Sequence, residues 1–155
     1  MAKNPKEQPQ QEQPSGQFAI QRLYIKDSSY EAPNVPQILR ENWEPQADIN
    51  VNTTNTEIEK NIYEVVLTIT ITTKIKDKVA FLVEVQQAGI FTVKDFPEQD
   101  KDHLLRAYCS SILFPYARQH ITNKVVDGGF PPIYLAPINF EAVYMQEKQQ
   151  DKDKK

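Results

Sequence analysis

The fold is decided by residues 61–91, which read NIYEVVLTITITTKIKDKVAFLVEVQQAGIF. Apolar and polar side chains alternate along this stretch, on both sides of a turn that we expect at Asp77-Lys78. Because successive side chains of a β-strand point to opposite faces, the alternation predicts a half-buried antiparallel hairpin. Its apolar face is predicted to consist of Tyr63, Val65, Leu67, Ile69, Ile71, Ile75, Val79, Phe81, Val83 and Val85. The other face would carry a row of threonines with Leu82 and Glu84, a surface better suited to binding a partner than to catalysis.

Two weaker strands are predicted before the hairpin, at residues 18–30 and 47–57, and the hairpin itself is expected to end at Gly89. In the first strand, strict alternation would place on one face Phe18, Ile20, Arg22, Tyr24 and Lys26. Two prolines exclude regular structure in the connection between these strands, which also carries Trp43.

A long helix is predicted from Pro97 to the pair Gly128-Gly129, with acidic residues in its first turns, where the helix dipole favours negative charge. One apolar stripe at helical spacing consists of Leu104, Leu105, Tyr108, Ile112 and Tyr116, and further apolar residues outside it are Leu113, Phe114 and Ile121. A helix with one face exposed to solvent has a narrower apolar arc than this one. We therefore expect this helix to pack against its own sheet on one side and a second subunit on the other, with a kink or break at Pro115.

The two ends of the chain differ from the middle. Residues 1–17 are rich in Gln, Pro, Lys and Glu, and we expect them to be disordered because they offer too little apolar surface to bury. A last helix is expected to start near Asn139, a good N-cap residue, and residues 146–155 read as a charged, solvated tail. Residues 18–145 would then form one folded domain of the α+β class.

Composition narrows the functional classes. The formal net charge of -3 argues against nucleic acid as a partner, because phosphate binding depends on an excess of Lys and Arg. The single cysteine is consistent with a reducing cytoplasm, and the N-terminus shows no apolar core of the kind a signal peptide requires. We therefore expect a cytoplasmic protein with no segment that inserts into a membrane.

No residue set for catalysis is apparent. Cys109, His103 and His120 have neither the spacing of a metal site nor that of a nucleophilic pair, and no phosphate-binding loop is present in the sequence. We expect no enzyme activity, no cofactor and no metal. The aromatic residues are more informative, because Trp43 and Tyr134 lie in irregular segments. Such groups either cap a core or line a groove for apolar peptide, and pattern alone favours core capping.

Several stretches resemble the SecB family of protein-export chaperones almost word for word. They are IQRLYIKD (20–27) with EAPN (31–34), YEVVL (63–67), FLVEVQQAGIF (81–91), ILFPYAR (112–118) and LAPINF (135–140). The resemblance implies a four-stranded antiparallel sheet with a long helix on one face and a short C-terminal helix. It also implies four subunits assembled as a dimer of dimers. The residues expected to support or form the subunit interface are Val83, Val85, Tyr108, Cys109 and Ile112.

By the same resemblance, the protein would be an ATP-independent chaperone that keeps preproteins unfolded and delivers them to SecA, the motor of the Sec translocase. The SecA-binding surface carries over to Asp27, Glu31, Leu82 and Glu84. The groove for unfolded clients carries over to Trp43, Tyr134, Phe140, Tyr144 and Met145. An alternative is a solitary SecB-like chaperone dedicated to one substrate or one toxin.

Overall fold

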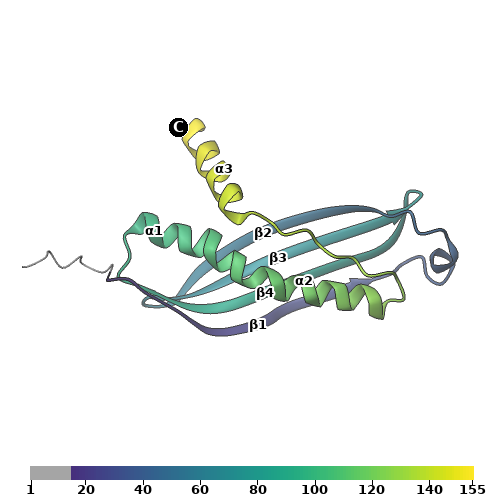
Figure 1. The fold of residues 1–155 in the computed structure, drawn as a ribbon, viewed down its shortest axis with the longest axis horizontal. Helices are drawn as coiled ribbons and strands as arrows, with labels where there is room; N and C mark the ends of the chain where they lie inside the picture. The colour runs from purple at the N-terminus through teal and green to yellow at the C-terminus, as the bar shows by residue number, and fades with distance from the viewer. Residues whose placement is uncertain (1–14) are drawn as a thin grey trace, which may run out of the picture.

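The structure is a computed structural model that describes residues 15–155 (Figure 1). Most of the predicted N-terminal tail, residues 1–14, lies outside the described residues, and Gln17 already belongs to the first strand. The elements in chain order are β1 (Gln17–Glu31), the 3-10 helix η1 (Gln37–Arg40), β2 (Gln46–Glu59), β3 (Ile62–Ile75), β4 (Lys78–Lys94), α1 (Glu98–His103), the π-helical turn η2 (Leu104–Tyr108), α2 (Cys109–Asp127) and α3 (Phe140–Asp153).

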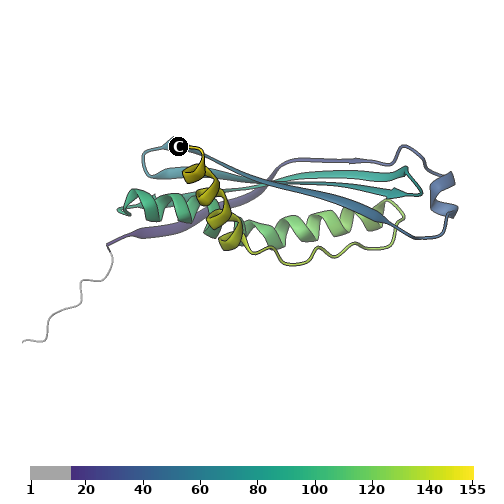
Figure 2. The same ribbon diagram turned by 90° about the horizontal axis from the view of Figure 1, so that it is seen from above.

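The strands form one antiparallel sheet in the order β1-β4-β3-β2, so β1 and β2 are its edges. Helices α1 and α2 lie along one side of this sheet (Figures 1 and 2). We call the face of β3 that carries Val65, Leu67 and Ile69 the covered face, since these side chains are buried beneath α2. The face that carries Glu64 and Thr70 is the open face, and no helix of the described chain lies on it. The predicted α+β arrangement of sheet, long helix and C-terminal helix is confirmed.

The central hairpin is confirmed, with two corrections. The turn consists of Lys76 and Asp77, one residue earlier than predicted, and both adopt positive φ (49° and 65°), as a tight two-residue hairpin turn requires. Gly89 does not end the hairpin, because β4 continues to Lys94. A Cβ at Gly89 would lie 2.7 Å from the Phe91 ring, so this glycine is a point of close packing inside a strand rather than a terminator.

The predicted face of the first strand is wrong after Ile20. Register shifts between Ile20 and Arg22 and between Ile25 and Asp27 each insert one extra residue into β1 opposite β4. Each such bulge reverses the alternation that follows it. Together they keep Leu23 and Tyr30 packed on the covered core.

The long helix runs from Glu98 to Asp127, and Pro115 lies inside α2 without ending it. Its departure from α-helical hydrogen bonding is η2, one turn of π-helix. The side chains that it buries at four-residue intervals are Leu105, Cys109, Leu113, Ala117, Ile121 and Val125. The stripe that we identified from spacing is a different one, since Tyr108 and Tyr116 on it are exposed in the single chain.

Both helix ends near the last connection follow from local chemistry. Phe130 donates its N–H to the Val125 carbonyl (3.2 Å), and Gly129 adopts φ 88°, so α2 ends in a Schellman motif. Asn139 caps α3 as predicted, because its Oδ1 accepts from the Ala142 N–H at 3.0 Å. Helix α3 then continues to Asp153, so most of the segment that we read as a solvated tail is helical.

Candidate binding surfaces

A pocket of about 270 Å3 lies where the edge strand β2 meets η2 and α3. Its side chains are mostly apolar, with an ion pair at the rim, and they come from Ile49, Val51, Asn52, Thr53, Arg106, Ile138, Phe140, Val143, Tyr144 and Glu147. Ile49 and Val51 pair with Ile71 and Ile69, so they lie on the covered face. At this edge no further strand pairs with β2 within residues 15–155. We call this hollow the edge pocket.

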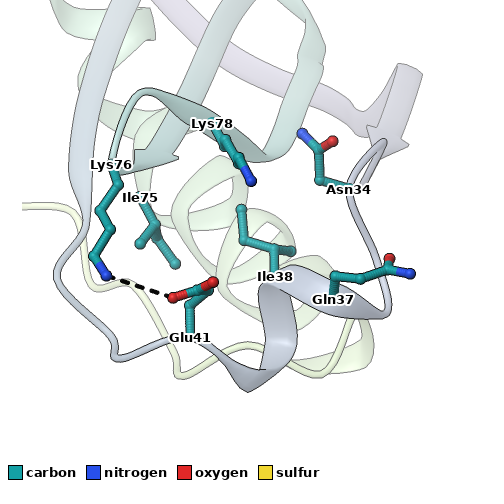
Figure 3. Close-up of a pocket in the computed structure, with 7 residues that line it drawn as sticks. All are labelled: Asn34, Gln37, Ile38, Glu41, Ile75, Lys76 and Lys78. Carbon is teal, nitrogen blue, oxygen red and sulfur yellow. Dashed lines mark ion pairs between the residues drawn. The ribbon is translucent and has the colours of Figure 1, made fainter.

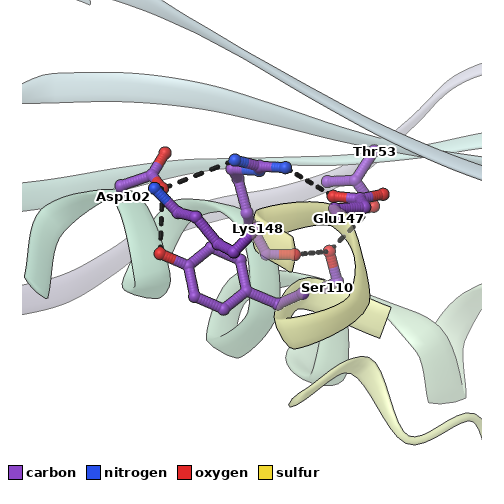
Figure 4. A network of polar contacts seen from close by, with 7 residues as sticks. Thr53, Asp102, Ser110, Glu147 and Lys148 are labelled. Carbon is purple, nitrogen blue, oxygen red and sulfur yellow. Dashed lines mark hydrogen bonds and ion pairs between the residues drawn. The ribbon is translucent and has the colours of Figure 1, made fainter. Parts of the chain in front are cut away.

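A polar network joins α1 and η2 to α3 along one wall of the edge pocket (Figure 4). Tyr144 donates its hydroxyl to Asp102 Oδ2 at 2.9 Å, and Lys148 Nζ lies 2.9 Å from the same oxygen. Arg106 pairs with Glu147 at 2.5 Å and more loosely with Asp102 at 3.4 Å. Partial burial opposes ionisation of Asp102, but Lys148, Tyr144 and Arg106 together lower its pKa below the ordinary value. Asp102 is therefore a carboxylate at neutral pH and holds the network together.

The five predicted client-groove residues are divided between separate places. Phe140 and Tyr144 line the edge pocket, although they are only 5% and 6% exposed. Trp43 packs on Phe130 instead, with ring centroids 5.8 Å apart. The other two are largely exposed, Tyr134 at 77% and Met145 at 65%. The sequence analysis did not predict that β2 and Arg106 line the pocket. The alternation of Ile49 and Val51 with polar residues did indicate the strand, but not its part in the pocket.

The open face gathers the four residues that resemblance assigned to SecA. Glu31 of β1 is the pairing partner of Leu82 in β4, and Asp27 is the partner of Gln86. Glu84 lies between them on the same face and accepts a hydrogen bond from Thr70 Oγ1 at 2.8 Å. Within residues 15–155 none of these three carboxylates forms an ion pair. We call the surface formed by Asp27, Glu31, Leu82 and Glu84 the acidic patch.

Beside the acidic patch, a fourth carboxylate on the open face is neutralised. Hydrogen bonds from Lys26 (2.6 Å) and from the Tyr24 hydroxyl lower the pKa of Glu64. Burial, together with the nearby Glu64 charge, raises the pKa of Tyr24 to about 12. Glu64 therefore adds little to the negative charge that the acidic patch brings to this face.

The five predicted interface residues fall into two groups. Val83, Val85 and Cys109 have no exposed surface in the single chain, so any part they play in assembly is through the position of α2. Burial raises the pKa of the Cys109 thiol to about 12, as expected for a structural cysteine. Tyr108 is exposed but packs edge-on against Phe18 of β1, with ring centroids 5.2 Å apart, and Ile112 is half-buried against the core, so both lie on a flank of the helix. Only these last two can touch another subunit directly.

The histidines belong to structural contacts. His120 Nε2 lies 2.7 Å from Ser28 Oγ, where α2 crosses β1, and burial with the nearby Lys124 charge lowers its pKa. His103 Nε2 lies 2.5 Å from Glu141 Oε2 at the start of α3. In the described part of the chain, no three His, Cys, Asp or Glu side chains come together as a metal site.

A second hollow, of about 260 Å3, lies at the other end of the sheet between η1 and the β3–β4 turn (Figure 3). Ile38 and Ile75 form its apolar floor, and Lys76 pairs with Glu41 at 3.6 Å on its rim. None of the predicted site residues lines it.

None of the helices described here is both long enough and apolar enough to span a bilayer.

The chain is similar to proteins of one known family. The family model described as "Preprotein translocase subunit SecB" matches residues 9–151. Protein-export protein SecB of Legionella pneumophila is 53% identical over 140 residues, covering 90% of this chain and 86% of the relative. That of Methylococcus capsulatus is 51% identical over 138 residues, covering 89% of each chain.

One solved structure has the same fold at low sequence identity. It is the Mycobacterium tuberculosis Rv1957 SecB-like chaperone in complex with a ChAD peptide from the Rv1956 HigA1 antitoxin. The TM-score is 0.66 at 12% identity, over 78% of this chain and 90% of that one. The family model matches most of the chain, and the two relatives are about half identical to it over nearly its whole length. The chain therefore belongs to the SecB family of protein-export chaperones.

Proposed function

We propose that this protein is an ATP-independent chaperone that holds newly made preproteins unfolded in the cytoplasm and delivers them to SecA. The observation that carries the proposal is the separation of two unlike surfaces by the sheet. The edge pocket opens on the side of the covered face, and the acidic patch lies on the open face. A client and a motor protein could then be bound at the same time without competing for one surface.

Client binding is assigned to apolar side chains along the edge of the subunit. The proposed contacts begin at Trp43, follow the connection that carries Tyr134, and reach Phe140 and Tyr144 in the edge pocket and Met145 beside it. An unfolded chain exposes scattered apolar side chains, and several weak contacts on one chaperone add up by raising the effective concentration at each remaining site. No sequence motif in the client is needed.

Delivery is assigned to the acidic patch. Glu31 and Glu84 flank the apolar side chain of Leu82, which is half-buried on the open face, and Asp27 lies further along the same face opposite Gln86. Unpaired carboxylates around one apolar contact favour a basic partner, because charge complementarity steers encounter and selects against acidic surfaces. We propose SecA as this basic partner.

Assembly is assigned to the flank of the long helix that lies beside the edge strand β1. Tyr108 and Tyr116 are exposed there beside the half-buried Ile112, and Ile20 and Ile25 are exposed on the neighbouring edge strand β1. A contiguous apolar surface of this kind is typical of a subunit interface. We propose a homotetramer, a dimer of dimers, in which these residues are covered.

A dedicated chaperone for one substrate or one toxin is the second candidate. It draws on the likeness in fold to the M. tuberculosis chaperone bound to an antitoxin peptide. The acidic patch favours delivery to a motor, for which a dedicated chaperone has no need. Tight binding of a single protein together with failure to bind SecA would favour the second candidate.

The test is a native mass measurement of the purified protein with and without a permanently unfolded polypeptide. The proposal predicts a mass of four subunits that increases by one client chain. A monomer that ignores the unfolded polypeptide would contradict it.

A further inference from the structure

Tyr144, a proposed client contact, is hidden in the structure. Its hydroxyl is bonded to Asp102, and the cations of Arg106 and Lys148 lie 5.2 and 5.6 Å from its ring centroid. The imidazole of His103 packs edge-on at 5.3 Å. Only 6% of the residue is exposed, so an unfolded chain cannot reach this ring while these contacts hold.

The contacts that hide the ring are individually weak. Of the fourteen residues of α3, only Phe140 and Tyr144 are buried. Beyond Tyr144, the helix is tied down by two interhelical ion pairs, Arg106 to Glu147 and Lys148 to Asp102. The side chains of these pairs are 25–51% exposed, and ion pairs in that setting are easily screened by salt. The far half of α3 therefore has little to hold it in place.

The near end of α3 is anchored differently. The Phe140 ring packs on Phe114 of α2 at 5.8 Å, and Asn139 caps the helix. The segment that leads to this end, residues 131–139, contains neither helix nor strand. Helix α3 can thus swing about Phe140 without unfolding.

We propose that α3 is a gate over the edge pocket, held shut by an ion-pair latch formed by Asp102, Arg106, Glu147 and Lys148. Opening the latch frees Tyr144 and turns the edge pocket into a wider groove for an apolar client segment. This inference rests on the proposed client-binding function. It adds that access to the groove is controlled by charges outside it, and that salt should speed capture.

A fixed wall is the contrary arrangement and makes the opposite prediction. If the ion pairs only hold one side of a permanent pocket in place, breaking them dismantles the pocket and weakens client binding. If they latch a gate, breaking them speeds capture. The sign of the effect separates the two.

The decisive variant is Glu147→Gln with Lys148→Gln, which removes one acid and one base from α3 and so keeps the net charge. Asp151→Asn with Lys152→Gln is the matched control, since it makes the same change one turn later. Neither Asp151 nor Lys152 forms an ion pair within the described part of the chain. Both full-length variants are compared with the unaltered protein at about 0.01 M and about 1 M NaCl, where the screening length falls from about 30 Å to about 3 Å.

Two quantities are measured on the same samples: amide hydrogen exchange in α3, and the association rate of a fluorescent, permanently unfolded polypeptide. At low salt the latch variant should exchange faster in α3 and capture the polypeptide roughly fivefold faster. That factor corresponds to the free energy of a surface ion pair at the upper end of the usual range. High salt should bring the unaltered protein and the control up to the same rate. Slower capture by the latch variant, or equal capture by all three proteins at low salt, would overturn the gate. Failure of all three to capture the polypeptide would overturn the proposed function, and the gate with it.

Discussion

The two faces of the sheet use the same strands for opposite purposes. Along β4, Val83 and Val85 point into the covered core with no exposed surface, whereas Leu82 and Glu84 between them point to the open face. Strand periodicity alone brings this about, because neighbours in a strand face opposite ways. One strand can therefore supply stability and recognition side by side, and a substitution should disturb one without the other.

The largest difference between the faces should appear in stability. Ile71→Ala on the covered face should lower the free energy of unfolding by about 2–5 kcal/mol, since it leaves a cavity in a fully buried site. Its neighbour Thr72 points to the open face, and Thr72→Ala should cost no more than about 0.5 kcal/mol. Urea unfolding of both variants measures the contrast, and similar losses would mean that the two faces do not differ as described.

A second prediction tests how β1 is tied to the covered side. A Cβ at Gly128 would lie 1.9 Å from the Tyr30 hydroxyl, so Gly128→Ala should cost about 1–3 kcal/mol through overpacking. That hydroxyl is buried without a hydrogen-bond partner among the described residues. Tyr30→Phe should therefore be tolerated alone and should restore part of the stability lost in Gly128→Ala. Absence of rescue in thermal unfolding would show that the clash lies elsewhere.

A third prediction concerns the thiol beneath the covered face. The pKa of Cys109 is raised to about 12 by burial, so at about pH 8 the folded protein holds it as the unreactive thiol. Its rate of labelling by a thiol reagent should follow global unfolding and rise steeply with urea. Fast labelling of the native protein would contradict a closed core. Met145→Cys on exposed α3 provides the reactive reference.

The open face should show the smallest change in stability and a specific change in binding. Glu84→Lys should leave urea unfolding within about 0.5 kcal/mol, yet weaken SecA binding about tenfold because it puts positive charge against a basic partner. Asp48→Lys makes the same charge change on β2, and its pairing with Thr72 places it on the open face away from the acidic patch. It should reduce the affinity for SecA much less. Equal losses would point to net charge rather than to the patch.

How much could be predicted from sequence depends on whether the information is local. The alternation in β3 and β4 and the Asn139 cap are local, and both were predicted. The two bulges in β1 were not, because the extra residues are recognised only by how the strand pairs with β4. Periodicity also pointed to the wrong stripe of the long helix, since Tyr108 and Tyr116 fit helical spacing as large aromatic residues but are exposed in the single chain.

The candidate sites divide in the same way. The members of the acidic patch were carried over residue by residue from the family resemblance, and the pairing of β1 with β4 brings them onto one face. The edge pocket could be predicted only in part. Glu147 and Lys148 read as a solvated tail until Arg106 and Asp102, some forty positions earlier, are brought opposite them. Polar pairs between distant segments leave no periodic signal in a sequence.

The central claim is that the sheet keeps the client surface and the delivery surface apart, and a single titration tests it. The purified protein is first saturated with a fluorescent, permanently unfolded polypeptide, and SecA is then added while binding of both is followed. The account predicts a ternary complex, with the affinity for SecA unchanged or increased by the client. Displacement of the polypeptide by SecA would show that the two partners share one surface, and would contradict the account.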